Sequence, residues 1–271
     1  MNLVNGKPSS SISIFDRGFL YGDGVFESIL VVKKQPKNLK LHINRLKKGC
    51  LLLGIKNLDH SLLKKHIKKS LSNINNCVLS INVTRGTAKK RGYDINFCAK
   101  PNIVLTTSSI PKYPKEYYKA GIKTKFSKIN LSKNDNLSNI KHSNRLEQVL
   151  ATKEITKSSP EIILCDNNDN IIEGISSNIF FIRKNIFYTP LLENEGVEGV
   201  MKSFIIKILK KNKYIVRNKK IKKNQIHKFD GAFFCNSIRL IWNIKSIENC
   251  NYNRSNNIEQ IISLINNEIY K

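Results

Sequence analysis

The chain has 271 residues, 40% of them hydrophobic and 25% charged, which is typical of a folded protein and excludes the disordered and fibrous classes. The formal net charge is +27, but only nine of the 47 basic residues are arginines, and the lysines are spread over nearly every segment. A groove for phosphates gathers both residue types on one element with aromatic residues between them, so we interpret the charge as compositional bias and expect no nucleic-acid partner.

The order of predicted elements indicates two domains. Residues 1–110 begin with short strands around hairpin turns and continue with helical spacing and strand alternation. Two prolines in SSIPKYPKEY can belong neither to a helix interior nor to a central strand, so residues 111–119 are the predicted linker. Residues 120–271 then form the larger C-terminal domain. Because strands and helices alternate in both halves, the sequence predicts an α/β (α+β) fold.

Hydrophobic periodicity and turn residues locate the individual elements. Helices are expected at residues 41–53, 61–71, 142–156 and 201–212, and from residue 258 onward. Strands are expected at 78–83, 103–107, 122–126 and 231–237, with several short strands between 161 and 190. Ser143 and Asn144 are the predicted capping residues of the helix that follows Lys141.

Targeting and metal-binding signals are missing from the sequence. No apolar run approaches the roughly 18 residues that a membrane-spanning helix needs, and MNLVNGKPSS lacks the pattern of a secretory signal. Six cysteines stand far apart without a CxxC pair, and five histidines show no ligand spacing. We therefore expect a cytoplasmic protein with no membrane partner, no disulfides and no metal.

Several segments stand out from the lysine-rich background. FDRGFLYGDGVFES, residues 15–28, holds three glycines that permit a tight turn, and HINRLKK carries Arg45, a residue type suited to bidentate binding of phosphate. Lys141 precedes a helix, and Glu173 ends a strand. The segments IIEGISSNIF, GVEGVMKSF and CNS offer hydroxyls and backbone N–H groups to an anion. Taken singly, a sheet turn would explain the glycines, and a solvated helix face would explain Arg45.

Together these groups match the needs of pyridoxal phosphate. Its aldehyde needs an amine, its pyridine nitrogen needs an acid that keeps it protonated, and its phosphate needs N–H groups and an arginine. The sequence supplies a lysine, a carboxylate, an arginine and several anion-binding turns. We therefore expect this cofactor.

Eight motifs in collinear order support the same interpretation. They are DRGFxYGDGVFE, HxxRL, VTRG, IKxxNRLEQVLA, EGxSSNIF, TP, GVxG and CNS. In this order they resemble the class IV aminotransferase family, of pyridoxal-phosphate fold type IV, from residue 2 to about residue 245. The resemblance implies a two-domain fold like that of D-amino-acid aminotransferase, a pyridoxal 5'-phosphate cofactor and a homodimer.

The resemblance also implies roles for individual residues. Lys141 matches the lysine that bonds the cofactor and acts as general acid and base, and Glu173 matches the acid that faces the pyridine nitrogen. The family's phosphate-binding positions match Arg45, Ser176, Ser177, Val200, Met201 and Ser237. Arg91 matches an arginine that reaches the substrate carboxylate from the neighbouring subunit, and Ser28 matches a residue on the substrate side.

Two positions depart from the family pattern. Lys202 stands where an arginine often follows the phosphate-binding turn, and Ser28 stands where many members have threonine. Neither change removes a required group, but both leave fine specificity open. Arg91 has a second interpretation, as one more exposed cation of its KKR run.

Within the family, NRLEQVLA and FFCNSIRLIW resemble the lyases that convert 4-amino-4-deoxychorismate into 4-aminobenzoate and pyruvate for folate synthesis. The implied reaction is a β-elimination on a small-molecule substrate. One alternative is an aminotransferase for D- or branched-chain amino acids. Another is a basic nucleic-acid-associated protein with a decayed site, against which the intact Lys141, Glu173 and Arg45 argue.

Overall fold

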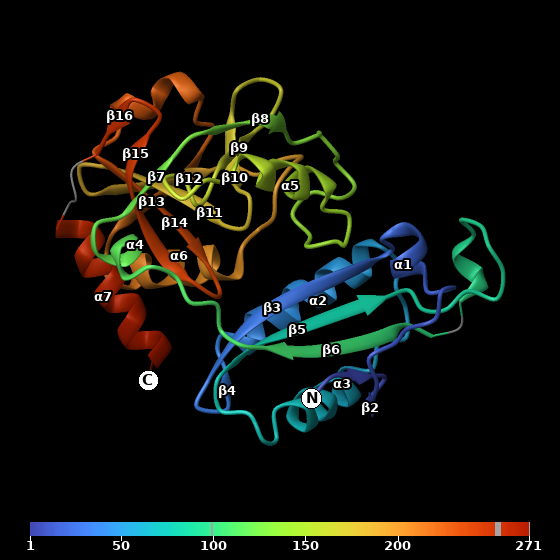
Figure 1. Ribbon diagram of the computed structural model, residues 1–271. Helices are drawn as coiled ribbons and strands as arrows, with labels where there is room; N and C mark the ends of the chain where they lie inside the picture. Colours follow the sequence, from blue (N-terminus) through green and yellow to red (C-terminus); the bar gives the residue numbers. More distant parts are fainter. Residues whose placement is uncertain (99, 253–255, 271) are drawn as a thin grey trace. The chain divides into compact units, whose positions relative to one another are not determined.

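A six-stranded sheet organises the first of the two units into which the chain divides (Figure 1). The computed structural model describes residues 1–98, 100–252 and 256–270. Unit 1 comprises Met1–Ile110 and Ile140–Asn144, and unit 2 comprises Pro111–Asn139 and the chain from Arg145 onward. No helix in the described part of the chain is long and apolar enough to cross a membrane.

Unit 1 is an antiparallel sheet whose strands lie in the order β2-β1-β6-β5-β3-β4. Its central strands, β3, β5 and β6, pair over most of their length. The elements of unit 1 are β1 (Leu3–Val4), β2 (Lys7–Pro8), α1 (Arg17–Tyr21), β3 (Gly24–Val32), β4 (Gln35–Pro36), α2 (Leu39–Leu52), α3 (His60–Ser70), β5 (Cys77–Thr84), η1 (Ile95–Phe97) and β6 (Asn102–Ser108).

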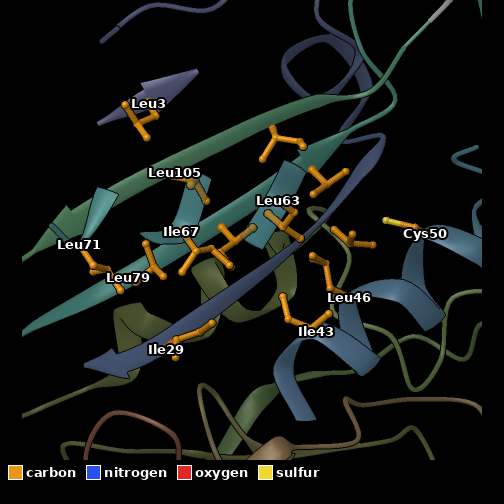
Figure 2. Close-up of a cluster of buried hydrophobic side chains, with 14 of the residues drawn as sticks. Leu3, Ile29, Ile43, Leu46, Cys50, Leu63, Ile67, Leu71, Leu79 and Leu105 are labelled. Carbon is orange, nitrogen blue, oxygen red and sulfur yellow. The ribbon is translucent and has the colours of Figure 1, made fainter. Parts of the chain in front are cut away.

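Alternate residues along the central strands form the apolar core on one face of this sheet. Ile29 and Leu79 lie opposite each other on β3 and β5, and both are fully buried. Leu46 of α2 and Leu63 of α3 belong to the same cluster (Figure 2). Burial of each such side chain stabilises the fold by about 1.5–3 kcal/mol. The packing fixes which side of α2 faces β3, and therefore where its inward polar residues lie.

Residues 141–143 extend this sheet. The N–H of Phe26 donates to the carbonyl of Lys141 (2.9 Å), and the N–H of Ser143 donates to the carbonyl of Gly24 (2.9 Å). Lys141 is thus positioned by β3 and belongs to unit 1, although the sequence suggested a lysine carried by the C-terminal domain.

The same pairing corrects the helix predicted over 142–156. Backbone groups that pair with a strand cannot also form the first turn of a helix, so α5 spans only Leu146–Ala151 and continues as the 3-10 turn η2 (Thr152–Glu154). Arg145 occupies the N-cap position and its side chain makes no capping hydrogen bond. The two residues predicted as caps lie before it: Ser143 pairs with β3, and Asn144 donates from its side chain to the carbonyl of Gly22.

Unit 2 contains a three-stranded sheet, β10-β9-β8, and a seven-stranded sheet, β13-β12-β11-β14-β15-β16, in which β7 also pairs with β15. Its elements are α4 (Lys115–Lys119), β7 (Ile122–Thr124), β8 (Phe126–Asn130), α5, η2, β9 (Ile163–Cys165), β10 (Ile171–Gly174), β11 (Asn178–Arg183), β12 (Ile186–Pro190), α6 (Val200–Lys211), β13 (Ile215–Lys219), η3 (Lys223–Lys228), β14 (Gly231–Asn236), β15 (Leu240–Ile247), β16 (Cys250–Asn251) and α7 (Asn256–Tyr270).

Aromatic side chains pack against the larger sheet of unit 2. Trp242 of β15 is almost fully buried and meets the rings of Tyr113 and Tyr117 edge to face, with centroids 4.9 and 5.2 Å away. These tyrosines lie in the segment predicted as a linker, where α4 begins directly after Pro114. The linker is therefore partly helical and packed, because proline is tolerated at the start of a helix. The mixed α/β character, α2, α3, α6 and the central strands are as the sequence predicts.

Candidate active site

Lys141 lies on the edge of β3, on the same face of the sheet as Phe26. The two residues are opposite each other in the pairing that follows the bridge between Val25 and His142. The Nζ atom of Lys141 stands 4.3 Å from the centroid of the Phe26 ring. An ammonium group over an aromatic face is electrostatically attracted to it. A backbone hydrogen bond to β3 therefore positions the main chain of the lysine, and the contact with Phe26 orients its amine.

Glu27, the next residue of β3, points to the opposite face and meets two side chains of α2. Its carboxylate accepts hydrogen bonds from Nε and Nη2 of Arg45, at 2.7 and 2.6 Å, in a bidentate pair. It also accepts from Nδ1 of His42 at 2.6 Å. Glu27 and His42 are both 1% exposed. The plane of the Arg45 guanidinium is thus fixed by a buried carboxylate.

The pKa values of this cluster follow from burial and charge. Burial raises the pKa of Glu27, but hydrogen bonds from Arg45 and His42 outweigh it and hold the pKa below its ordinary value. Burial lowers the pKa of His42; Glu27 opposes this, and the charges of Arg45 and Lys141 lower it further. The imidazole is therefore neutral near pH 7, and its contact with Glu27 is a hydrogen bond instead of an ion pair. Nε2 of His42 has no hydrogen-bond partner within the described residues.

A second carboxylate, Asp23, organises the glycine-rich turn before β3. It accepts from Nε of Arg17 at 2.8 Å and from Nε and Nη2 of Arg85 at 2.7 and 2.9 Å. Arg17 also donates to the backbone carbonyls of Gly92 and Tyr93, at 2.8 and 3.1 Å. The turn and the loop that carries Arg91 are therefore tied together. Arg91 itself is exposed.

In unit 2, Glu173 is buried at the end of β10. Its Oε2 accepts a hydrogen bond from the N–H of Val197 at 2.8 Å, across the loop between β12 and α6. Gly196, in the left-handed region at φ +78°, makes the turn that aims this N–H. The loop thus holds the carboxylate in one orientation.

The N-terminus of α6 has the features of an anion site. Gly199 occupies the N-cap position, and no side chain caps the helix there. A Cβ at Gly199 would stand 1.7 Å from Oδ1 of Asn178, so only glycine fits. Val200 and Met201 therefore begin the helix with backbone N–H groups that a side-chain cap does not occupy, and twelve residues of helix place a partial positive charge behind them. Lys202 is buried, with its Nζ 3.1 Å from Glu198.

The turn with Ser176 and Ser177 is built on a carboxylate that the sequence interpretation did not identify. Glu161, 1% exposed, accepts from the N–H of Ser176 at 2.9 Å and from the hydroxyls of Ser177 and Ser176 at 2.8 and 3.3 Å. Its other partner is Arg239, 2.5 Å away. The resemblance implies that both serines line the phosphate side, whereas the structure directs both hydroxyls to Glu161.

Arg239 connects this turn with the one that carries Ser237. The N–H of Arg239 donates to Oδ1 of Asn236 at 2.8 Å, and Nδ2 of Asn236 donates to the carbonyl of Ser176 at 3.1 Å. The guanidinium lies 4.1 Å from the Trp242 ring. One buried ion pair therefore supports both small-residue turns of unit 2.

The predicted residues thus fall into two sets. Unit 1 carries Lys141, Phe26 and Ser28 on one face of its sheet, whereas Arg45 binds Glu27 on the other face. Unit 2 brings together Glu173, Ser176, Ser177, Val200, Met201 and Ser237 at strand ends and a helix start. The supporting residues Glu27, His42, Asp23, Glu161 and Arg239 were missed. The scarcity of arginine was the available signal, since Arg17, Arg45, Arg85 and Arg239 all bind buried or half-buried carboxylates.

We expect His42 to make the protein less stable in mild acid. Its pKa is lowered in the folded state, so below about pH 6.5 the unfolded chain binds more protons and the free energy of unfolding falls. His60 and His66, whose pKa values are also lowered by burial, add to this slope. His42→Gln should make the slope shallower, by at most about 1.4 kcal/mol per pH unit. Urea unfolding at several pH values between about 7.5 and about 5.5 gives the free energy of unfolding, and hence this slope. A slope unchanged in His42→Gln, and equal to that of the exposed-site control His227→Gln, would contradict the assignment.

Glu161→Ala should lower the free energy of unfolding by about 3–5 kcal/mol, because it leaves Arg239 as an uncompensated buried charge. The matched control is Glu193→Ala, which removes an exposed ion pair with Lys220 from the same unit and should cost less than about 1 kcal/mol. Denaturant unfolding of both variants tests the difference. Equal, small losses would show that the Glu161–Arg239 pair does not support the unit.

The chain is similar in sequence and fold to several known proteins. A solved structure of 4-amino-4-deoxychorismate lyase from Pseudomonas aeruginosa matches with a TM-score of 0.95 and 28% identity, covering 98% of each chain. Aminodeoxychorismate lyase of Vibrio harveyi is 26% identical over 236 residues, 87% of each chain. D-alanine aminotransferase of Bacillus licheniformis is 24% identical over 254 residues, 91% of this chain and 88% of that one. The family described as amino-transferase class IV matches residues 24–247. The chain belongs to the class IV aminotransferase family.

Proposed function

We propose that this protein is a pyridoxal-phosphate-dependent 4-amino-4-deoxychorismate lyase that releases 4-aminobenzoate and pyruvate. The observation that carries the proposal is the match to the Pseudomonas aeruginosa lyase, which extends over 98% of both chains at 28% identity. The aminotransferase relatives support the same cofactor with a different outcome. Membership of the family alone therefore leaves the reaction open, and the match to the lyase favours elimination.

The residues present fit the cofactor. When bound, pyridoxal phosphate supplies an aldehyde that links to an amine and a protonated ring that withdraws electrons from the carbon beside that amine. The amides of Val200 and Met201, which no side chain caps, suit a phosphate. Arg45 and Ser237 are the proposed side-chain partners of the phosphate, and Ser176 and Ser177 contribute through the turn that they hold.

Glu173 is the group proposed to keep a proton on the pyridine nitrogen. A buried carboxylate that accepts a backbone N–H is fixed in direction, which suits a partner in a fixed position such as a ring nitrogen.

Lys141 is the proposed acid and base. Its amine would bond the cofactor and, when free, would remove the proton from C4 of the substrate ring. Loss of that proton would expel the ether oxygen at C3, so that the enolpyruvyl group would leave as the enolate of pyruvate, take up a proton to become pyruvate, and leave an aromatic ring. The pairing of Lys141 with β3 fixes the backbone from which the amine extends.

A homodimer is the proposed assembly, and an exposed apolar surface on unit 1 supports it. Phe19 and Tyr93 are 70% and 82% exposed, and Ile14, Phe15 and Ile95 are exposed as well. The two segments that carry them are adjacent, because the N–H of Ala88 donates to the carbonyl of Phe15 at 3.0 Å. Exposed apolar residues grouped in this way are typical of a protein interface. Arg91 belongs to the same loop, and its proposed role is to bind the substrate in the neighbouring subunit. The proposed location is the cytoplasm.

The proposal predicts a covalent label on one residue. The protein should purify yellow, and borohydride should bleach the colour by making the lysine–cofactor bond permanent, with the label on Lys141 in a peptide map. Lys141→Ala should remove the label, and Lys133→Ala, an exposed-site control, should retain it. Pyruvate should appear from aminodeoxychorismate without a second substrate. A label on another lysine would overturn the cofactor assignment, and consumption of 2-oxoglutarate without pyruvate release would identify an aminotransferase.

Subunit mixing tests the role of Arg91. If each site takes Lys141 from one chain and Arg91 from its partner, inactive Lys141→Ala and Arg91→Ala proteins should complement each other after joint refolding. Random pairing makes about half of the dimers mixed, and one intact site in each returns about a quarter of wild-type activity. No recovery, with subunit exchange verified by mass spectrometry, would remove Arg91 from the neighbouring site.

A further inference from the structure

The face of the unit 1 sheet opposite the apolar core carries a group of small polar side chains. Directly opposite residues on paired strands share a face, and the register aligns Ser28 of β3 with Ser80 of β5 and Ser80 with Thr106 of β6. The neighbouring row aligns Phe26 with Asn82. Three hydroxyls and one amide therefore lie side by side across three strands. We call Ser28, Ser80, Asn82 and Thr106 the polar row.

The side chains of the polar row are partly accessible, and the fold does not engage them in hydrogen bonds. All four residues are half-buried. Among the described residues, none of their side chains takes part in a hydrogen bond, whereas other polar side chains of the unit, such as Thr84 and Asn102, both bond Asp16. Half-buried polar groups in a sheet usually find a protein partner or water. Four of them together, without a protein partner, form a surface ready to bind a polar ligand.

The polar row lies close to Lys141, the proposed acid and base. Its Nζ lies over the ring of Phe26, which stands on the same face and in the same row as Asn82. Neighbouring strands are about 4.8 Å apart, and residues two apart on a strand are separated by about 6.8 Å. The polar row therefore begins one strand spacing from Phe26 and extends about 12 Å from it. A six-membered ring with its substituents has this size.

We infer that the polar row binds the carboxylate and ether oxygens of the substrate, on the side away from the reacting amine. The inference rests on the proposed function and deepens it. Hydroxyl and amide groups donate hydrogen bonds to carboxylates, and neutral donors do so without the desolvation cost of a buried charge. An apolar amino-acid side chain would leave these donors unpaired, which selects against it. The row therefore favours an oxygen-rich ring substrate over branched-chain amino acids.

The experiment removes the donors while keeping the shape of each side chain. Variants Ser80→Ala, Thr106→Val and Asn82→Leu, singly and together, are compared with Ser108→Ala, a hydroxyl deletion at the exposed end of β6 on the same face. For aminodeoxychorismate, KM should rise about tenfold for each donor that binds, with a smaller change in kcat. The Kd of chorismate, which carries a hydroxyl in place of the reacting amine, should rise in parallel. Borohydride labelling of Lys141 should be unchanged in every variant, and Ser108→Ala should behave as wild type.

Two results would overturn the inference. The first leaves the proposed function intact, and the second contradicts the proposed function as well. If the wild-type protein is labelled on Lys141 and releases pyruvate, but the combined variant keeps KM and the chorismate Kd within twofold, the polar row does not bind substrate and the proposed function stands. If the wild-type protein instead transaminates apolar amino acids, and the combined variant improves this activity, the proposed function and the inference both fail.

Discussion

Strand β3 determines the arrangement of unit 1, because alternate residues point to opposite faces of the sheet. Its even-numbered positions Phe26 and Ser28 stand on the polar face with Lys141, and the intervening Glu27 stands on the core face, where α2 brings Arg45. A shift of one residue in register would exchange these faces. Long pairing with β5 and the apolar cluster beneath it prevent that shift. The register is therefore as important to the site as any side chain in it.

Ion pairs between carboxylates and arginines hold the turns and the helix that carry the other proposed site residues. Asp23, Glu27 and Glu161 each bind arginine, in a chain where lysine is far more abundant. Arginine presents a rigid planar fork that satisfies both oxygens of a carboxylate, whereas a lysine offers one mobile ammonium group. Such pairs contribute little net stability compared with apolar packing, but losing one partner is costly. Their value here is geometric, since each pair fixes a turn or a helix that carries proposed site residues.

Local pattern and motif order predicted the mixed fold, the long helices and central strands, and the residues of the family's motifs. The start of α5 was not predictable from local pattern, because the helical spacing after Lys141 competes with pairing to β3, a partner more than a hundred residues earlier. Glu161 was missed for a similar reason. It follows a proline in an exposed-looking segment, and only the fold brings Arg239 and the serine turn to it. Contacts over such distances leave no periodic signal.

The pairing of residues 141–143 with β3 also governs how this chain can be divided. A fragment ending at residue 110 would leave the N–H of Phe26 and the carbonyl of Gly24 without their partners. Open strand edges of this kind are where sheets of separate molecules join and aggregate. The chain returns to unit 1 after a stretch in unit 2, and the returning segment is the one that carries the lysine. Completion of the first sheet and the placement of Lys141 beside β3 therefore both depend on residues 141–143, which follow a long stretch of unit 2.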